Sequence, residues 1–352
     1  MPASDCLLND TAVAEPRYKP GTAGGVRRQA APLEQLPPFP EFRPLALTDR
    51  PLLQPRMSAL QPEISDRCFT NLFLWRDFYD IRISRHGSNI CILCASETTP
   101  EKPFFFPPLG DENVAQCAAD CFDYLRSRNF TPVIRRASQK FVSRHISGDP
   151  RYDVREDPDI SDYVYRSEDM IHLRGRRYHG QRNYIKRFEK NFPRHETEFL
   201  SERNLEACVR FCDRWLRKKL DLLARRHGER PDDSSEEVVF LRAEVETARN
   251  ILRHFETLDL RGLAIRIDGD IRAFTVGEKL NDRTALIHIE KCDHGYLGIN
   301  QVLTQRFCRL VWADCEYINR MEDLGIEGLR KAKLALGPHH MARKFHIFLK
   351  HH

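Results

Sequence analysis

Two side chains in one predicted strand could take part in proton transfer. His288 and Glu290 lie in the segment 284–290, where apolar residues alternate as they do in a β-strand. We expect both to project from the same face, roughly 7 Å apart at a rise of about 3.3 Å per residue. An imidazole or a carboxylate can accept a proton from an attacking amine or hydroxyl. A cross-strand ion pair with Lys279 or Arg266 is the structural alternative for Glu290.

A second group of charged residues follows a short predicted strand. Polar groups at this edge of an open α/β sheet commonly face a cleft, so Arg320 and Asp323 could orient a substrate there. Asp323 could instead cap the next helix. Arg330, Lys331 and Lys333 end that helix, where they could bind a phosphate backbone or a terminal adenosine, or only stabilise the helix dipole.

The strongest local positive charge lies in 166–190. This segment holds eight Lys and Arg residues and three acidic residues. A helical period places its aromatic residues on one side and a basic stripe on the other. We call this stripe, formed by His179, Arg182, Lys186 and Lys190, the basic ridge. The candidate contact residues in this segment are Arg176, Arg177, His179, Arg182, Asn183 and Lys186. RNA, an anionic membrane surface, or solvent alone could face such a ridge.

The composition describes an ordinary globular chain. Its 352 residues are 41% hydrophobic and 30% charged, with a net charge of +5, and no apolar run is long enough to predict a transmembrane segment. The N-terminus lacks the apolar core of a signal peptide. We therefore expect a cytoplasmic protein, or one peripheral to the inner face of the membrane.

The eleven cysteines are expected to be reduced thiols that fill the core. Cys91-x-x-Cys94 has no second pair to complete a zinc site. The pairs Cys117/Cys121 and Cys208/Cys212 have the i,i+4 spacing of buried helical positions, where cysteine acts as a small hydrophobe. No metal site is predicted.

The order of predicted elements indicates two lobes. We expect a disordered proline-rich tail at 1–40, a first lobe at 41–165, a basic linking helix at 166–194 and a second, catalytic lobe at 195–352. Each lobe shows two helices, three strands, a helix, a strand, a helix and a last strand, which suggests a diverged tandem duplication with mixed α/β sheets. The dipeptide Asp268-Gly269 predicts a tight hairpin between two of these strands.

A loop at 292–298 precedes a predicted helix in the second lobe. Exposed backbone N–H groups at a helix N-terminus favour an anion, and in acetyl-CoA enzymes of the acyltransferase fold a glycine-rich loop holds the pyrophosphate here. The glycines of this loop are sparse and Asp293 lies among them, so a plain tight turn remains the alternative.

Four segments together carry a resemblance to a known family: RGRRYHGQRN at 174–183, FTVGE at 274–278, IHIEK at 287–291 and GIEGLRKAK at 325–333. They are similar to the catalytic C-terminal domain of the phosphatidylglycerol lysyltransferases, over about residues 45–350. The resemblance implies two tandem GNAT-like acyltransferase lobes and transfer of an aminoacyl group from aminoacyl-tRNA to a lipid or another hydroxyl or amine.

Two departures from the family pattern affect this expectation. The membrane-embedded half of the lipid-modifying enzymes is missing from this sequence, which bears on the acceptor. Met321 stands where an acidic residue is expected in relatives, which bears on the activity.

The leading hypothesis is an aminoacyltransferase in which Glu290, with His288, acts as base while Arg320 and Asp323 orient the donor. The basic ridge, Arg330, Lys331 and Lys333 would contact the tRNA. No cofactor is expected, since the donor is already an activated ester. The alternatives are an N-acyltransferase that uses acetyl- or acyl-CoA, and a non-catalytic protein that binds RNA or a membrane surface.

Overall fold

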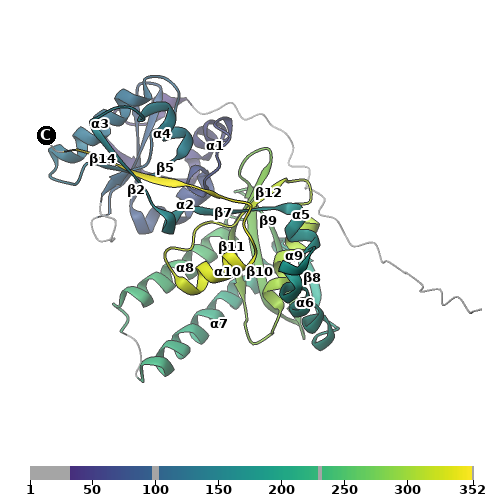
Figure 1. Cartoon of the computed structure of the whole chain (residues 1–352). Coiled ribbons are helices and arrows are strands. Elements are labelled where there is room, and N and C mark those ends of the chain that lie inside the picture. The colour runs from purple at the N-terminus through teal and green to yellow at the C-terminus, as the bar shows by residue number, and fades with distance from the viewer. Residues whose placement is uncertain (1–31, 97–102, 229–231, 351–352) are drawn as a thin grey trace, which may run out of the picture.

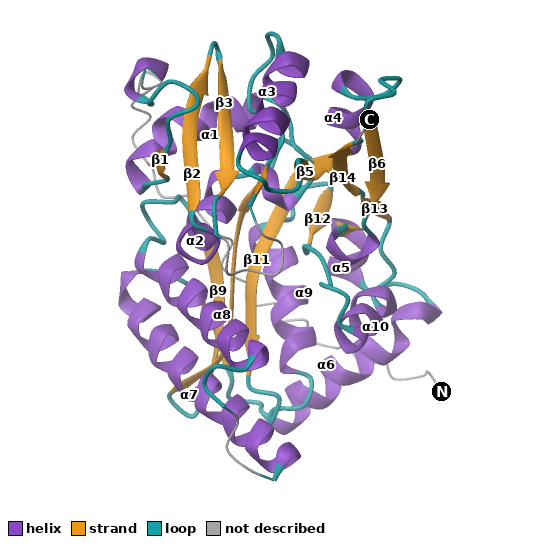
Figure 2. Cartoon of the chain, turned by 90° about the vertical axis from the view of Figure 1, so that its left-hand side faces the viewer, coloured by secondary structure: helices purple, strands orange, loops and turns teal. Residues whose placement is uncertain are grey.

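The computed structural model describes residues 32–96, 103–228 and 232–350. Within them lie two mixed sheets of seven strands each, one per lobe (Figures 1 and 2). The first 31 residues of the expected tail are outside the described residues. Leu36, in the described part of that tail, is buried in the core of the first lobe.

The first sheet has the strand order β1-β2-β3-β4-β5-β14-β6. Its strands are β1 (Arg43–Pro44), β2 (Ile81–His86), β3 (Asn89–Cys94), β4 (Phe104–Phe105), β5 (Val133–Ser138), β14 (Lys344–Leu349) and β6 (Tyr152–Glu156). Its helices are α1 (Arg50–Ala59), α2 (Phe69–Tyr79), α3 (Val114–Ser127) and α4 (Gln139–His145). The helix α3 carries the most regular apolar stripe of this lobe, which it packs on β3 and β5.

The second sheet has the order β13-β7-β12-β11-β10-β9-β8. Its strands are β13 (His340–Ala342), β7 (Asp162–Arg166), β12 (Tyr317–Asn319), β11 (Thr284–Cys292), β10 (Asp270–Lys279), β9 (Arg261–Ile267) and β8 (Glu196–Phe199). Its helices are α5 (Ser167–His172), α6 (His179–Asn191), α7 (Glu202–His227), α8 (Glu236–Arg253), α9 (Ile299–Val311) and α10 (Glu327–Ala335). The hairpin predicted at Asp268-Gly269 is confirmed, and both residues have positive φ.

Two strands depart from the expected boundaries. We expected β7 in the lobe 41–165, but it pairs with β12 and β13 in the second sheet. We expected β14 in the lobe 195–352, but it lies between β5 and β6 in the first sheet. Apolar alternation identifies a strand without identifying its neighbours, so the sequence could not show this exchange.

The expected linking helix at 166–194 is interrupted. It consists of α5, a 3-10 turn at Arg176–Tyr178 and α6. The buried side chains of α6, Ile185 and Phe188, belong to the core that α9 shares with the second sheet. The basic ridge therefore lies on the outward side of a helix that is anchored through its apolar side.

The two lobes share a hydrophobic core. One continuous cluster contains Leu72 and Phe73 of α2 together with Ile251 and Leu252 of α8. None of the helices in the described ranges has the length and apolar character needed to cross a bilayer.

Candidate functional site

A cavity opens where two neighbouring strands of the second sheet diverge. The strand β11 pairs with β12 only over residues 284–286, whereas it continues beside β10 to Cys292. The side chains of residues 287–291 line a cavity of about 770 Å³ at this free edge. Because β12 does not pair with β11 beyond residue 286, side chains from both faces of the sheet can reach the cavity.

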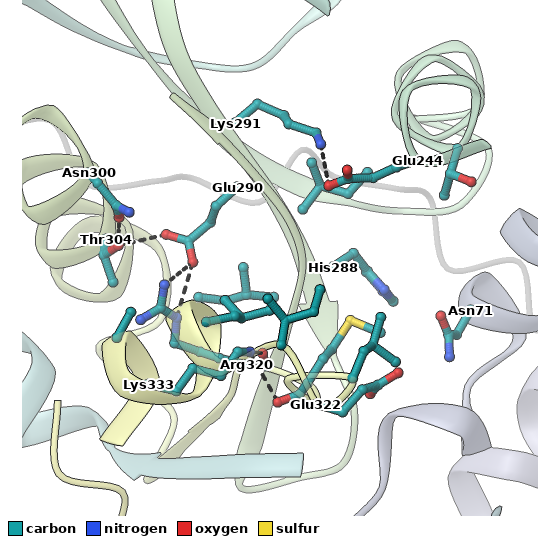
Figure 3. Close-up of a pocket in the computed structure, with 18 of the residues that line it drawn as sticks. Asn71, Glu244, His288, Glu290, Lys291, Asn300, Thr304, Arg320, Glu322 and Lys333 are labelled. Atoms are coloured by element: carbon teal, nitrogen blue, oxygen red, sulfur yellow. Dashed lines mark hydrogen bonds and ion pairs between the residues drawn. The ribbon is translucent and has the colours of Figure 1, made fainter. Parts of the chain in front are cut away.

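A bulge in β11 decides which face each polar residue occupies. Val276 and Gly277 are adjacent in β10, but their partners are Ile289 and Ile287, so His288 is an extra residue on β11. As a result His288 and Glu290 point to opposite sides of the strand (Figure 3). The prediction that they share a face is wrong, because a bulge shifts the alternation by one residue.

Glu290 lies on the α9 side, where all its acceptor groups are used. Its Oε1 accepts a hydrogen bond from Thr304 Oγ1 at 2.6 Å, and its Oε2 accepts from Arg320 Nε at 3.0 Å and from Nη2. Burial works to lower the pKa of Arg320, but the Glu290 carboxylate outweighs it and the pKa is raised. The geometry thus gives Glu290 the role of holding Arg320 at the cavity (Figure 3).

His288 lies on the other side of β11, paired with a buried carboxylate. Its Nε2 is 2.8 Å from Glu278 Oε1, and the two side chains are 1% and 7% exposed. When Nε2 carries the proton that Glu278 accepts, Nδ1 is the basic nitrogen of the ring. Among the described residues Nδ1 has no hydrogen-bond partner, and His288 lines the cavity. This arrangement suits a proton acceptor.

Lys333 is the one predicted cation of α10 that lines the cavity. Its Nζ donates hydrogen bonds to the backbone carbonyls of Arg320 and Met321, the second at 3.2 Å. Burial and the neighbouring Arg320 lower the pKa of Lys333 to about 8. Met321, which also lines the cavity, has a positive φ of 60°.

The other charged residues of this region hold the loop before α10. Asp323 is fully buried and accepts hydrogen bonds from Tyr163 Oη at 2.6 Å and Arg330 Nε at 2.8 Å. The Arg330 contact is the main reason why the pKa of Asp323 is lowered to about 2. Lys331 is exposed and pairs with Glu327. Asp323, Arg330 and Lys331 do not line the cavity.

The basic ridge lies beside the cavity rather than in it. Arg182 donates hydrogen bonds to the carbonyls of Leu173 and Gly175, so it ties α6 to the end of α5. The remaining candidates (Arg176, Arg177, His179, Asn183 and Lys186) are exposed, with Asn183 hydrogen-bonded to His179. From the same helix, Gln181 and Tyr184 line the cavity.

Sequence reasoning missed a cluster of buried charges between the lobes. Lys344, fully buried, contacts Asp66 at 2.6 Å, Asp162 at 2.7 Å and Glu322 at 3.2 Å. Arg136 contacts Asp66 at 3.2 Å. Burial would raise the pKa of Glu322, but Lys344 and Arg136 hold it at about 2. The sequence signal was a lone lysine at the start of the apolar strand 344–349.

Further polar and apolar residues complete the cavity. Lys291 pairs with Glu244 of α8 and its Nζ lies 3.9 Å from the centre of a Trp215 ring. Members of the apolar walls include Leu72, Leu74, Trp75, Phe240, Leu329, Ala332 and Leu336. Asp66, Arg136 and Glu322 of the buried charge cluster also line it, so both lobes contribute to the site.

The helix N-terminus expected to bind an anion is covered by protein. Gly298 precedes α9 with a φ of 94°, and a Cβ there would lie 2.3 Å from the Tyr184 carbonyl oxygen of α6. Asp293 of the same loop pairs with Lys218 at 2.5 Å and accepts from the Gly295 N–H at 3.0 Å. The glycine therefore permits close packing of α6 on α9, which is a structural role.

The two mixed sheets of seven strands confirm the mixed α/β fold in two lobes that the sequence predicted, and a solved structure described below shares this fold. The model of the family "Phosphatidylglycerol lysyltransferase, C-terminal" matches residues 58–348. The chain belongs to this family, which confirms the resemblance. A comparison with curated proteins finds no match.

Solved structures agree with this assignment. A conserved protein of unknown function from Bacteroides thetaiotaomicron VPI-5482 is 25% identical with a TM-score of 0.73, covering 88% of this chain and 99% of that one. The C-terminal domain of a putative lysylphosphatidylglycerol synthetase from Agrobacterium fabrum is 13% identical with a TM-score of 0.55, covering 84% and 91%. L-PGS from Bacillus licheniformis is 13% identical with a TM-score of 0.51, covering 78% and 85%. Family and fold support an enzyme of the acyltransferase type.

Proposed function

We propose that this chain transfers an aminoacyl group from aminoacyl-tRNA to a hydroxyl or amine, with a lipid as the first acceptor to test. The observation that carries the proposal is the cavity at the free edge of β11, lined on one face by His288, which pairs with the buried Glu278, and on the other by the Arg320–Glu290 pair. Two reactants can approach the same strand edge from opposite faces of the sheet.

The proposed chemistry is a transesterification, or aminolysis for an amine acceptor. His288 Nδ1 takes the proton of the acceptor as its oxygen or nitrogen attacks the ester carbonyl, and Glu278 stabilises the imidazolium that forms. The guanidinium of Arg320 or the ammonium of Lys333 stabilises the oxyanion. When the tetrahedral intermediate collapses, the 3′ oxygen of the tRNA leaves and receives the proton from His288.

The residues around the cavity support a lipid acceptor and a tRNA donor. Apolar residues of α10, among them Leu329 and Ala332, would accept acyl chains, and Ile326 at its start is 51% exposed. The exposed residues of the basic ridge would bind the tRNA backbone, with affinity that falls as salt rises. A protein that uses both substrates would act in the cytoplasm at the inner face of a membrane.

The test follows a labelled amino acid. The full chain is incubated with total tRNA charged with radioactive amino acids and with a lipid extract, and label is measured in the organic phase. We expect transfer by the parent, loss of about 10²-fold or more in rate for His288→Gln, and the parental rate for the control Lys350→Ala, an exposed residue outside the cavity. Label that stays on tRNA with the parent, with lipid and small amine acceptors alike, would refute the proposal.

Thermal unfolding and tRNA-binding measurements separate the two alternatives from the proposal. Acetyl-CoA that raises the unfolding temperature while tRNA does not would favour an N-acyltransferase; the close packing of α6 on the N-terminus of α9 argues against it. Salt-sensitive tRNA binding without any transfer would favour a non-catalytic binding protein.

A further inference from the structure

Three cysteines converge in the core of the first lobe, away from the cavity. Cys91 lies on β3, and Cys117 and Cys121 lie one turn apart on α3, which covers that strand. The sulfur of Cys91 is 3.4 Å from that of Cys117 and 3.6 Å from that of Cys121, and the three sulfurs all lie within 4.8 Å of one another. All three side chains are buried, and none lines the cavity.

The separations match metal coordination better than a disulfide. Sulfurs bound to one metal ion at about 2.3 Å stand about 3.8–4.0 Å apart, so the Cys91–Cys117 and Cys91–Cys121 pairs would each need to separate by only a few tenths of an ångström. A disulfide bond of about 2.05 Å would require one pair to close by more than about 1.3 Å. The convergence does not follow from helical spacing alone, because Cys208 and Cys212 have the same spacing and, among the residues that the structure describes, form no group with a third thiol.

We propose that Cys91, Cys117 and Cys121 bind one Cu(I) ion in three-coordinate geometry. Thiolates favour soft ions such as Cu(I). Within the described parts of the chain no fourth ligand joins the group. Its neighbours are the apolar Phe105 and Phe122 of the same cluster and, near Cys117, the paired side chains of His86 and Asp120. Structural zinc almost always takes four ligands, which this site does not offer.

Binding is a ligand exchange without a redox step. Cu(I) replaces the protons of the thiols that become thiolates, and these protons pass to solvent. Affinity for Cu(I) therefore rises with pH. The ion would join β3 to α3, so its binding stabilises the folded first lobe.

The experiment is a competition for Cu(I). The full chain, reduced and under nitrogen, is titrated into Cu(I) held by the coloured chelator bicinchoninate, and the loss of colour is measured. We expect the parent to withdraw one ion per chain, more tightly at pH 8 than at pH 6.5. Cys117→Ser and Cys91→Ala should withdraw none, while the control Cys208→Ser should equal the parent.

Several results would overturn the proposal. The parent could withdraw no copper, Cys117→Ser could withdraw as much as the parent, or Cys208→Ser could lose binding too. Fewer than eleven free thiols in the denatured, freshly purified parent would indicate a disulfide instead. If circular dichroism shows that the variants do not fold, the test is the unfolding temperature of the parent protein. We expect Cu(I) to raise it by several degrees, and the absence of a rise would refute the site.

Discussion

His288 and Glu290 have different roles because their partners differ. Glu290 is held by an arginine and a threonine, while His288 has a carboxylate on one nitrogen and an unpartnered second nitrogen at the cavity. The sequence could predict that both residues matter, since both are polar in an apolar strand. It could not rank them, because the ranking depends on partners that are distant in sequence, Glu278 and Arg320.

Glu278 should act on the reaction only through His288. Glu278→Gln removes the negative charge that stabilises the imidazolium, so we expect kcat to fall by about 10²-fold or more. The Michaelis constants for donor and acceptor should change less than about twofold, because Glu278 is not among the residues lining the cavity. Steady-state kinetics separates the two effects. The control Glu316→Gln alters an exposed carboxylate that pairs with Arg283 and should keep the parental kcat. A parental kcat for Glu278→Gln would contradict this role.

Lys333 should make ligand binding depend on pH. Its pKa of about 8 means that it is a cation at pH 7 and mostly neutral at pH 9, so tRNA affinity should weaken across this range. Lys333→Met should bind more weakly at pH 7 and lose that part of the pH dependence. Fluorescence anisotropy at constant ionic strength measures both, with the exposed Lys350→Met as a control that keeps the parental profile. The pH dependence of folding stability has the opposite sign. Burial lowers the pKa of Lys333 from 10.5, so the contribution of Lys333 to the free energy of unfolding rises between about pH 8 and pH 10.5.

At the scale of elements, local pattern and long-range pairing differ in how far they can be predicted. The strands β9, β10 and β11 and the turn at Asp268-Gly269 follow from alternation and turn chemistry, both local. The bulge at His288 arises from pairing with Gly277 across the sheet. A Cβ at Gly277 would lie 2.4 Å from the Leu286 carbonyl oxygen, so only a residue without a side chain allows β11 to approach this closely.

Gly298 should be required for the contact between α6 and α9. Gly298→Ala places a Cβ 2.3 Å from the Tyr184 carbonyl oxygen at a positive φ, so we expect a loss of roughly 2–4 kcal/mol in the free energy of unfolding. Urea denaturation measures it. In the control Gly228→Ala the φ is also positive, but nothing lies within 4 Å, and the loss should be about 1 kcal/mol. Equal losses in the two variants would show that packing at Gly298 is unimportant.

At the scale of the whole molecule, Lys344 connects the lobes. It is carried by β14 of the first sheet and contacts Asp162 of β7 in the second. The tandem lobes could be expected from the repeated order of elements. Their interlocking could not, because a strand selects its partner by backbone hydrogen bonds that leave no mark in its own sequence. For the same reason the sequence could not show that Cys91 lies beside two cysteines of α3, which are 26 and 30 residues away.

Replacing Lys344 should destabilise both lobes together. Lys344→Met leaves three buried carboxylates with Arg136 as the nearby cation, and removal of one member of a buried ion pair costs about 3–5 kcal/mol. We expect a lower unfolding midpoint in urea and lower activity, because Asp66 and Glu322 line the cavity. Lys350→Met, at an exposed position after the same strand, should unfold like the parent. A Lys344→Met protein with parental stability would show that the cluster does not connect the lobes.

The position of β14 also has a consequence for biosynthesis. The ladder of the first sheet has a place between β5 and β6 that only residues 344–349 fill. During translation the edges of β5 and β6 therefore stay unpaired on this side, and the first sheet cannot close until residues 344–349 have been synthesised. Nascent chains arrested before residue 344 should accordingly be sensitive to protease in the first lobe and be held by chaperones.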